Sequence, residues 1–256
     1  MSGDHSDQIT STDAKLVLLE MSADRGNRMD DTGKIAEQSL GEPETAEAPP
    51  RKKTRRREQQ RAIDTRRAIL EAALNEFAER GFDGASVRRI GERAGLEFTL
   101  IKYHFRSKDA LWRAVAENAF GQIEALWDEA VPADSQMSAA ERVKIEFRTF
   151  LRFTVAHTAF HHFMLRENQG ASPRLAWLVD KLLKKTMSRV VPQIRQAQAD
   201  GQLIQADPAH VYYMLIGMSS VLSSLNGEMS ATIGFSLNDS KAVDAFWNLI
   251  ERAVFN

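Results

Sequence analysis

The sequence contains no cysteine among its 256 residues. This absence excludes disulfide bonds and thiolate metal sites, and it fits the reducing cytoplasm, where we expect the protein to lie. The chain also has almost no net charge, −1 at pH 7. Without a strong overall charge there is no global field that attracts nucleic acid, so any such binding must come from a local basic patch.

A targeting signal and a membrane-spanning segment are also absent from the pattern. The first fifteen residues have neither the basic start nor the apolar stretch of a secretory signal. The longest stretch without charged residues, 208–227, approaches membrane-spanning length, but it contains one His, four Ser and one Asn. We therefore expect a buried helix and no membrane partner.

The amino-terminal residues 1–60 are expected to be disordered. Residues 1–50 contain eleven Asp and Glu against four Lys and Arg, and this acidic tail cannot bury enough apolar area to offset its chain entropy. The charge then reverses, because RKKTRRREQQR (51–61) holds seven cations and one acid. This stretch is either a solvated tail or a flexible basic arm that neutralises DNA phosphates or enters the minor groove.

From Asp64 onward, apolar residues recur with helical spacing, and no window alternates long enough to predict a sheet. The first helix should end at Gly81. Short helices are then expected at 87–94 and about 97–104, and a helix at about 139–156. Further helix starts are predicted at Ser107, Ser172-Pro173, Asp207-Pro208 and Asp239-Ser240. The predicted fold class is all-α.

Aromatic and basic residues alternate in GERAGLEFTLIKYHFRSKDALWRAV (91–115). Two short helices joined through a glycine, the second with exposed cations and aromatics, form the helix-turn-helix arrangement that enters the major groove of DNA. Residues of the inner and the outer face of this second helix would then alternate along the sequence. Leu96, Leu100 or Ile101, and Phe105 would face inward, and Phe98, Thr99, Lys102 and Tyr103 would face DNA. The alternative is a buried helix whose cations form a solvated edge.

The run AILEAALNEFAERGFDGASVRRIGERAGLEFTLIKYHFRSKDALWRAV resembles the amino-terminal domain of the tetracycline-repressor (TetR) family of transcriptional regulators. The shared features are F-A-x-x-G-F, a Ser-led helix with an internal Ile, a turn glycine and H-F-x-S-K. The resemblance implies a three-helix DNA-binding domain over residues 61–118. It also implies a larger helical ligand-binding and dimerisation domain over residues 119–256.

Carried over position by position, the resemblance implies a set of DNA-facing residues. Arg88 would read a guanine edge, Phe98 and Thr99 would touch thymine methyl groups, and Lys108 would hold a phosphate at a helix amino terminus. Lys102 stands where the family usually has a phosphate-binding Tyr, and Glu97 stands where it usually has Ser or Thr. The implied DNA-binding residues are Ser86, Arg88, Phe98, Thr99, Lys102, Tyr103, His104 and Lys108.

Two apolar stripes in the carboxy-terminal half predict a homodimer. On the helix that begins at Pro208 the apolar residues repeat at spacings of four and three, and a second stripe follows on the last helix. Such a two-fold dimer requires an inverted-repeat operator on double-stranded DNA. The alternative is that both stripes pack within one subunit. The predicted interface residues are Val211, Leu215, Met218, Leu222, Phe246 and Ile250.

A cluster of aromatic and histidine residues, most of it within residues 147–168, predicts a pocket for a small-molecule effector. Ordinary core with histidines at its wet edge is the alternative. The effector would release a repressor from DNA, although an activator is not excluded by the pattern. The predicted ligand-binding residues are Trp127, Phe153, His157, Phe160, His161, Met164 and Trp177.

A helical metal sensor or metalloenzyme is the rival hypothesis, because His157 and His161 are four residues apart and would share one helix face. Two histidines are fewer than the three or four ligands of most metal sites. The sequence has no nucleophile elbow, phosphate-binding loop or paired-carboxylate motif. We therefore predict no metal, no cofactor and no enzymatic activity.

Overall fold

Helix α2 opens the described part of the chain. The computed structural model describes residues 51–169 and 172–256, so the acidic tail predicted for residues 1–50 lies outside the described residues. Helix α2 spans Arg51–Gly84 and includes residues 51–60, for which we predicted a disordered arm. That prediction is wrong for these residues. Arg, Lys, Glu and Gln have good helix propensity, and they continue the helix towards the amino terminus.

Gly81 interrupts the regular path of α2 close to its end. Its φ and ψ are 67° and 176°, a conformation that glycine adopts at little cost because it has no Cβ. The predicted stop of the first helix at Gly81 is therefore confirmed, although residues 82–84 add a further helical turn.

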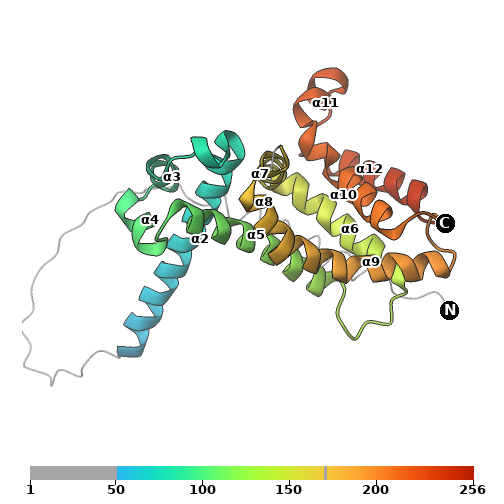
Figure 1. Cartoon of the computed structure of the whole chain (residues 1–256), viewed down its shortest axis with the longest axis horizontal. Coiled ribbons are helices and arrows are strands. Elements are labelled where there is room, and N and C mark those ends of the chain that lie inside the picture. The colour runs from blue at the N-terminus through green and yellow to red at the C-terminus, as the bar shows by residue number, and fades with distance from the viewer. Residues whose placement is uncertain (1–50, 170–171) are drawn as a thin grey trace, which may run out of the picture. The chain divides into compact units, whose positions relative to one another are not determined.

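Three helices follow in the amino-terminal part: α3 (Val87–Ala94), α4 (Phe98–His104) and α5 (Lys108–Ala130). Gly95, with φ 64°, ends α3 in the left-handed conformation. The hydroxyl of Ser107 accepts a hydrogen bond from the N–H of Ala110 at 3.0 Å and caps α5, as predicted. The three short connections place α3 and α4 side by side (Figure 1).

The predicted helix starts at Ser172, Asp207 and Asp239 are confirmed, since each side chain accepts a hydrogen bond from a backbone N–H of the following helix. Two helices, α7 and α11, and the π-helical turn η1 were not predicted. The carboxy-terminal elements are α6 (Ala139–Ala156), α7 (Thr158–Asn168), α8 (Pro173–Leu178), η1 (Val179–Leu183), α9 (Lys184–Ala199), α10 (Pro208–Ser224), α11 (Asn226–Ile233) and α12 (Ser240–Val254).

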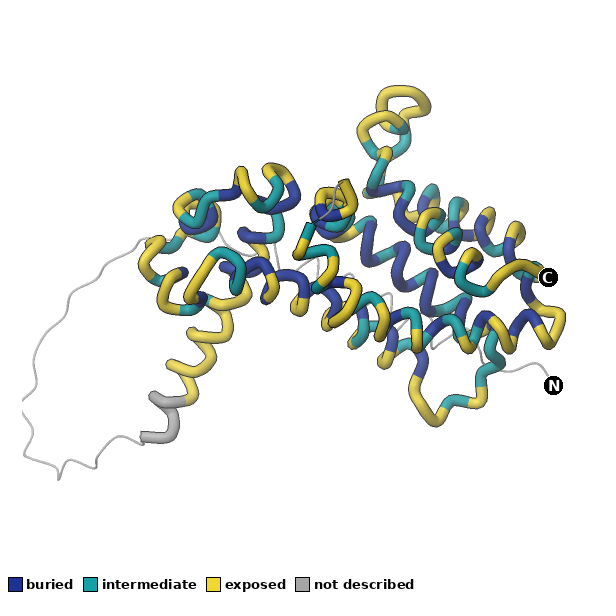
Figure 2. Tube along the Cα trace, viewed as in Figure 1, coloured by how far each residue is buried: buried dark blue, intermediate teal, exposed yellow. Residues whose placement is uncertain are grey.

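Helix α6 lies at the centre of the carboxy-terminal bundle. It packs against α5, α9, α10 and α12 (Figure 1), and most of its length is buried (Figure 2). Asp244 of α12 accepts hydrogen bonds from Arg148 and Arg152 of α6 at 3.3 and 3.0 Å, which joins the last helix to the core. The largest fully buried side chains include Trp112, Trp127, Trp247, Phe77, Phe147, Phe153 and Phe163.

The fold is all-α, as predicted. Within the described ranges the extended backbone pairs only at an isolated antiparallel bridge between Leu203 and Phe255. The uncharged stretch forms α10, whose Val211, Leu215 and Leu222 are buried. No helix in the part of the chain that the structure describes is both long and apolar enough to cross a membrane.

Candidate nucleic-acid interface

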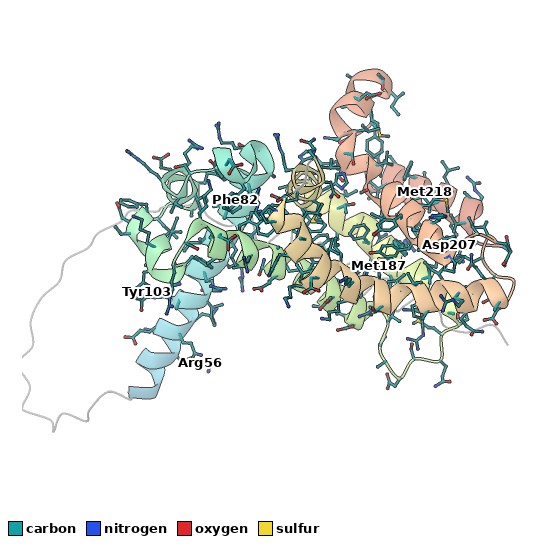
Figure 3. All side chains as sticks on the ribbon, in the orientation of Figure 1. Arg56, Phe82, Tyr103, Met187, Asp207 and Met218 are labelled. Carbon is teal, nitrogen blue, oxygen red and sulfur yellow. The ribbon has the colours of Figure 1, made fainter. Side chains whose placement is uncertain are left out.

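Helix α4 presents two distinct faces. Ile101 and Phe105, at 1% and 6% exposure, anchor it to the core. The opposite face carries Phe98 at 42% and Tyr103 at 83% exposure, and Thr99 and Lys102 are exposed with them. Tyr103 projects from the surface in Figure 3. The predicted division of this helix into an inner and an outer face is confirmed.

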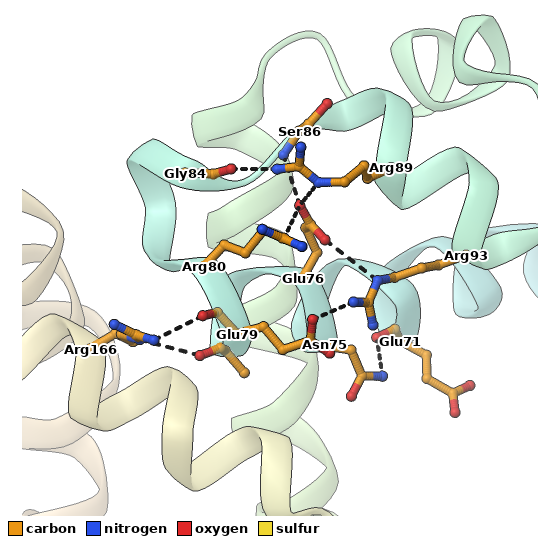
Figure 4. A network of polar contacts seen from close by, with 11 residues as sticks. Glu71, Asn75, Glu76, Glu79, Arg80, Gly84, Ser86, Arg89, Arg93 and Arg166 are labelled. Atoms are coloured by element: carbon orange, nitrogen blue, oxygen red, sulfur yellow. Dashed lines mark hydrogen bonds and ion pairs between the residues drawn. The ribbon is translucent and has the colours of Figure 1, made fainter.

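A buried carboxylate holds α3 against α2. Glu76 is fully buried, and its Oε1 accepts hydrogen bonds from the Ser86 N–H at 3.1 Å and from Arg89 Nε at 2.7 Å (Figure 4). Arg93 Nε lies 3.4 Å from Oε2, and Arg80 Nε lies 3.7 Å from Oε1. Because α3 supports α4, this network fixes the orientation of the exposed face. Sequence reasoning missed Glu76, although a carboxylate within the apolar stripe of a helix was a signal.

Two residues of the predicted set lie at the start of α3. Ser86 occupies the N-cap position, but its side chain makes no capping hydrogen bond, so the predicted cap is wrong. The Glu76 carboxylate takes the backbone N–H of Ser86 instead. Arg88 has a side chain that is 83% exposed and lies 3.3 Å from Glu92 of the same helix. A surface pair of this kind is weak and leaves Arg88 available to another partner.

The turn between α3 and α4 is unusually close. A Cβ at Gly91 would lie 2.7 Å from the carbonyl oxygen of Leu96 and 3.4 Å from Cα of Phe98. The backbone of α3 therefore approaches the first residue of α4 at a distance that only glycine permits without a shift. This contact sets how far α4 stands from α3.

Lys108 is turned towards the end of α2. Its Nζ donates to the carbonyl oxygen of Asp83 at 3.2 Å and lies 4.8 Å from the centre of the Phe82 ring. Burial lowers the pKa of this ammonium group below its ordinary value. His104, also in the predicted set, is half-buried between the rings of Tyr103 and Phe105.

The predicted ligand-binding residues do not form one cluster. The rings of Phe153, His157 and Phe160 lie near one another, with Phe153 at 4.7 Å from His157 and 5.4 Å from Phe160. Trp127 packs against Phe150, with ring centres 6.5 Å apart, and donates its Nε1–H to the carbonyl oxygen of Glu146 at 2.7 Å. Trp177 packs against Trp112, with ring centres 5.9 Å apart, and also lies outside the Phe153 group.

The histidines do not have the predicted relationship. His157 stands at the junction between α6 and α7, so it does not share a regular helix face with His161. His161 and Met164 are half-buried on α7. Burial, together with the neighbouring His162, lowers the pKa of His161. Among the residues that the structure describes, no group of three His, Cys, Asp or Glu side chains is placed to hold a metal ion.

A second buried carboxylate, Glu146, was also missed by the sequence reasoning. Its Oε1 accepts a hydrogen bond from Arg189 Nε at 2.8 Å, and Gln193 donates to its Oε2 at 3.4 Å. Arg189 also contacts Asp128 at 2.5 Å. Burial raises the pKa of Glu146, and the hydrogen bond and charge of Arg189 oppose that shift. This network joins α5, α6 and α9.

Four of the six predicted interface residues are buried inside the chain. Val211, Leu215, Leu222 and Ile250 are at most 2% exposed, because the stripes of α10 and α12 pack on the core that contains α6. These residues cannot reach a partner subunit, and their assignment to the interface is corrected. The other two predicted residues, Met218 (labelled in Figure 3) and Phe246, are half-buried.

Other apolar side chains of the same region are exposed. Tyr213 of α10 is 58% exposed, Leu249 of α12 is 55% exposed, and Leu225 at the end of α10 is 43% exposed. Ile233 of α11 is 70% exposed. The sequence contained this second set, but a heptad-like stripe does not show whether it packs on the core of its own subunit or on a partner subunit.

The amino-terminal helices match a known family. The sequence model described as "Bacterial regulatory proteins, tetR family" matches residues 69–115, from the buried part of α2 to the first turns of α5. The matched range contains Glu76, all of α3 and all of α4.

Similarity to individual proteins extends over most of the chain. The HTH-type transcriptional regulator RutR of Escherichia coli (strain K12) is 26% identical over 181 residues, which are 70% of this chain and 84% of that protein. The HTH-type transcriptional repressor NicS of Pseudomonas putida is 29% identical over 190 residues, 72% of this chain and 87% of that protein. The solved structure of the ketosteroid transcriptional regulator KstR2 of Mycobacterium tuberculosis has the same fold. It aligns with a TM-score of 0.59 and 21% identity over 75% of this chain and 95% of that chain.

Proposed function

Because this chain belongs to the TetR family of bacterial DNA-binding transcriptional regulators, a family without enzymatic activity, we propose that it represses transcription as a two-fold dimer. In this proposal a small molecule bound among the carboxy-terminal helices releases the dimer from an inverted-repeat operator. The name of the P. putida relative, a transcriptional repressor, supports this direction of regulation.

The observation that carries the proposal is the exposed face of α4. An aromatic ring at Phe98, a hydroxyl at Thr99 and an ammonium group at Lys102 lie outward, while Ile101 and Phe105 hold the helix on the core. The major groove of DNA offers thymine methyl groups to a ring and a hydroxyl, and phosphates to an ammonium group, so this combination of side chains suits it.

Each exposed side chain has a proposed role. Phe98 and Thr99 contact thymine methyl groups, and Lys102 and Tyr103 contact the phosphate and sugar edge of the groove. Arg88 reads a guanine edge through its guanidinium group, which its exposed pair with Glu92 leaves accessible. His104, half-buried behind Tyr103, supports that ring rather than DNA. Ser86 and Lys108 approach the backbone of the duplex at the amino-terminal ends of α3 and α5.

We place the dimer interface on the exposed faces of α10 and α12. Tyr213, Leu225 and Leu249 supply apolar area there, and the exposed Gly217 permits close approach between helices. The half-buried Met218 and Phe246 keep their proposed role in this interface. Ile233 of α11 is a further exposed apolar side chain.

The proposed effector is a largely apolar small molecule. KstR2, the solved structure of similar fold, is named a ketosteroid regulator, and this name supports an apolar class of effector. We place the effector at the aromatic group of Phe153 and Phe160, with His161 and Met164 of α7 at its edge. The rings are closely packed in this structure, so the effector must select a conformation in which they separate. Its affinity for that conformation, relative to the DNA-binding one, sets how far the equilibrium moves.

Selection from a random pool of duplex DNA tests the proposal. The purified protein is mixed with the pool at about physiological salt, and the retained DNA is sequenced. Enrichment of one inverted repeat is the expected result, and an Arg88→Ala variant should relax the preference at one base pair of each half-site while keeping its fold. If the wild-type protein enriches no sequence, the proposed function is wrong.

A further inference from the structure

The carboxy-terminal end of α2 receives an arginine from α7. Arg166 donates its Nε–H to the carbonyl oxygen of Ala78 at 3.3 Å and its Nη2–H to that of Glu79 at 2.8 Å (Figure 4). Both carbonyl groups belong to the last turn before the break at Gly81. Carbonyl groups of a last helical turn lack partners within the helix and form the negative end of its dipole, so a guanidinium group fits there.

A second arginine, from α8, holds the residue that follows the break. The centre of the Arg174 guanidinium group lies 4.0 Å from the centre of the Phe82 ring. Its Nε also lies 3.1 Å from the carboxylate of Glu167, which is 4% exposed and accepts a further hydrogen bond from Ser172 at 2.9 Å. Arg174 is therefore fixed on one side by a buried acid and covers an aromatic ring on the other.

The same short segment of α2 determines where α3 stands. Glu76 holds the Ser86 N–H and Arg89, and Arg89 also donates to the carbonyl oxygen of Gly84. Contacts thus run without interruption from α7 and α8, through the end of α2, to α3. None of the exposed residues of α4 takes part in them.

We infer that Arg166 and Arg174 are positioning residues that fix the angle of α3 and α4 on the carboxy-terminal helices, and that they thereby set which spacing of half-sites a dimer accepts. This inference rests on the proposed function. Neither arginine contacts DNA in it. Each acts through the end of α2, and a displacement of α7 or α8 by an effector would reach the DNA-reading face by this route.

The consequence is measurable because DNA spacing is a sensitive ruler. Each base pair added between half-sites moves one of them by about 3.4 Å along the duplex axis and rotates it by about a tenth of a turn. If α3 and α4, the DNA-binding head, are held rigidly, the dimer tolerates little change in the distance between half-sites. A head released from Arg166 should adjust to the changed distance.

The test compares the wild-type protein with Arg166→Ala. Water can replace the lost guanidinium group at the carbonyl oxygens of Ala78 and Glu79, because these contacts are part-buried and exposed, respectively. Phe82→Leu is the second variant, because it removes the ring below Arg174 and keeps an apolar side chain. Arg195→Ala, an exposed arginine of α9, is the matched control. Truncation of Arg174 itself is avoided because it would leave Glu167 buried without its cation.

The probes are the selected inverted repeat, the same repeat with one or two base pairs added or removed, and a single half-site. We expect Arg166→Ala and Phe82→Leu to lower the preference for the selected spacing by about threefold to tenfold. Half-site affinity should stay within about twofold of wild type. An unchanged spacing preference overturns the inference. An equal loss on half-sites also overturns it, because the arginines would then only stabilise the head.

A measurement without DNA separates failure of this inference from failure of the proposed function. Amide hydrogen exchange at the end of α2, residues 79–86, should be faster by about threefold to tenfold in Arg166→Ala than in the wild type or Arg195→Ala. Exchange within α3, α4, α9 and α10 should not change, because α3 and α4 stay folded while their attachment loosens. If the end of α2 exchanges at the wild-type rate, Arg166 does not fix it, whether or not the protein binds an operator.

Discussion

The Lys102 ammonium group lies 5.3 Å from the centre of the Phe98 ring, one helical turn away on the exposed face of α4. The ring supports the aliphatic stem of the lysine and keeps its charge at the edge of the face. The pair therefore presents an apolar surface and a cation together, which suits a base edge beside a phosphate.

Replacement of Lys102 by alanine should weaken binding to all DNA sequences. Each phosphate contact releases counterions, so the plot of log affinity against log salt should flatten by about one unit per subunit. Titration of operator and random duplexes at several salt concentrations measures this slope. Lys241→Ala, on the exposed start of α12, is the matched control and should keep the wild-type slope. An unchanged slope in Lys102→Ala would remove this residue from the phosphate contact.

Glu76→Gln should loosen the DNA-binding head. We expect a loss of about 2 kcal/mol in the free energy of unfolding, less than for a fully buried pair because the paired arginines are 36–50% exposed. Urea denaturation gives this value. Operator affinity should fall with it, since α3 loses its attachment to α2.

The control for this change is Glu79→Gln, which removes a half-exposed partner of Arg93. Its cost should remain below about 1 kcal/mol. If both variants lose the same stability, burial of Glu76 is not what makes its network important.

Leu249→Glu should dissociate the proposed dimer. Leu249 is 55% exposed on α12, so a carboxylate there is tolerated in one subunit but is desolvated without a partner in the proposed interface. Sedimentation velocity at micromolar protein should then report half the wild-type mass. Leu165→Glu changes a similarly exposed leucine of α7, at 42% exposure, and should leave the mass unchanged. A dimer that survives Leu249→Glu would place the interface elsewhere.

Glu146 should make stability depend on pH in a defined direction. Burial raises the pKa of Glu146 above its ordinary 4.5. Between that value and the folded-state pKa the folded chain binds more protons than the unfolded chain, so this group's contribution to the free energy of unfolding falls as pH rises. Glu146→Gln lacks the titration. Its stability relative to wild type should therefore improve as the pH rises above about 4.5.

Urea denaturation at a series of pH values measures this difference. Glu117→Gln, on the exposed surface of α5, should follow the wild-type curve in parallel. A constant gap between Glu146→Gln and wild type across the pH range would show that Glu146 titrates alike in both states.

The DNA-facing set and the pocket differed in how far they could be predicted. Local spacing along α4 decides which side of a single helix is apolar, so Phe105 could be separated from Phe98 and Tyr103 without a structure. The choice between Leu100 and Ile101 stayed open until the structure showed that Ile101 is the buried one. The pocket residues Trp127 and Trp177 come from different helices. Their separation from Phe153 depends on how those helices pack, and residue type carries no information about that.

Local patterns in the sequence were enough to predict the all-α class, the starts of four helices at Ser107, Ser172, Asp207 and Asp239, and the two faces of α4. These features depend on caps and on a period of 3.6 residues, which act within a few neighbouring residues. The packed fold was needed to show that Leu215 and Leu222 lie inside the subunit, that Glu76 joins α2 to α3, and that Arg166 reaches the end of α2. Such contacts join residues far apart in the chain, and the packing of whole helices selects them from many chemically equivalent alternatives.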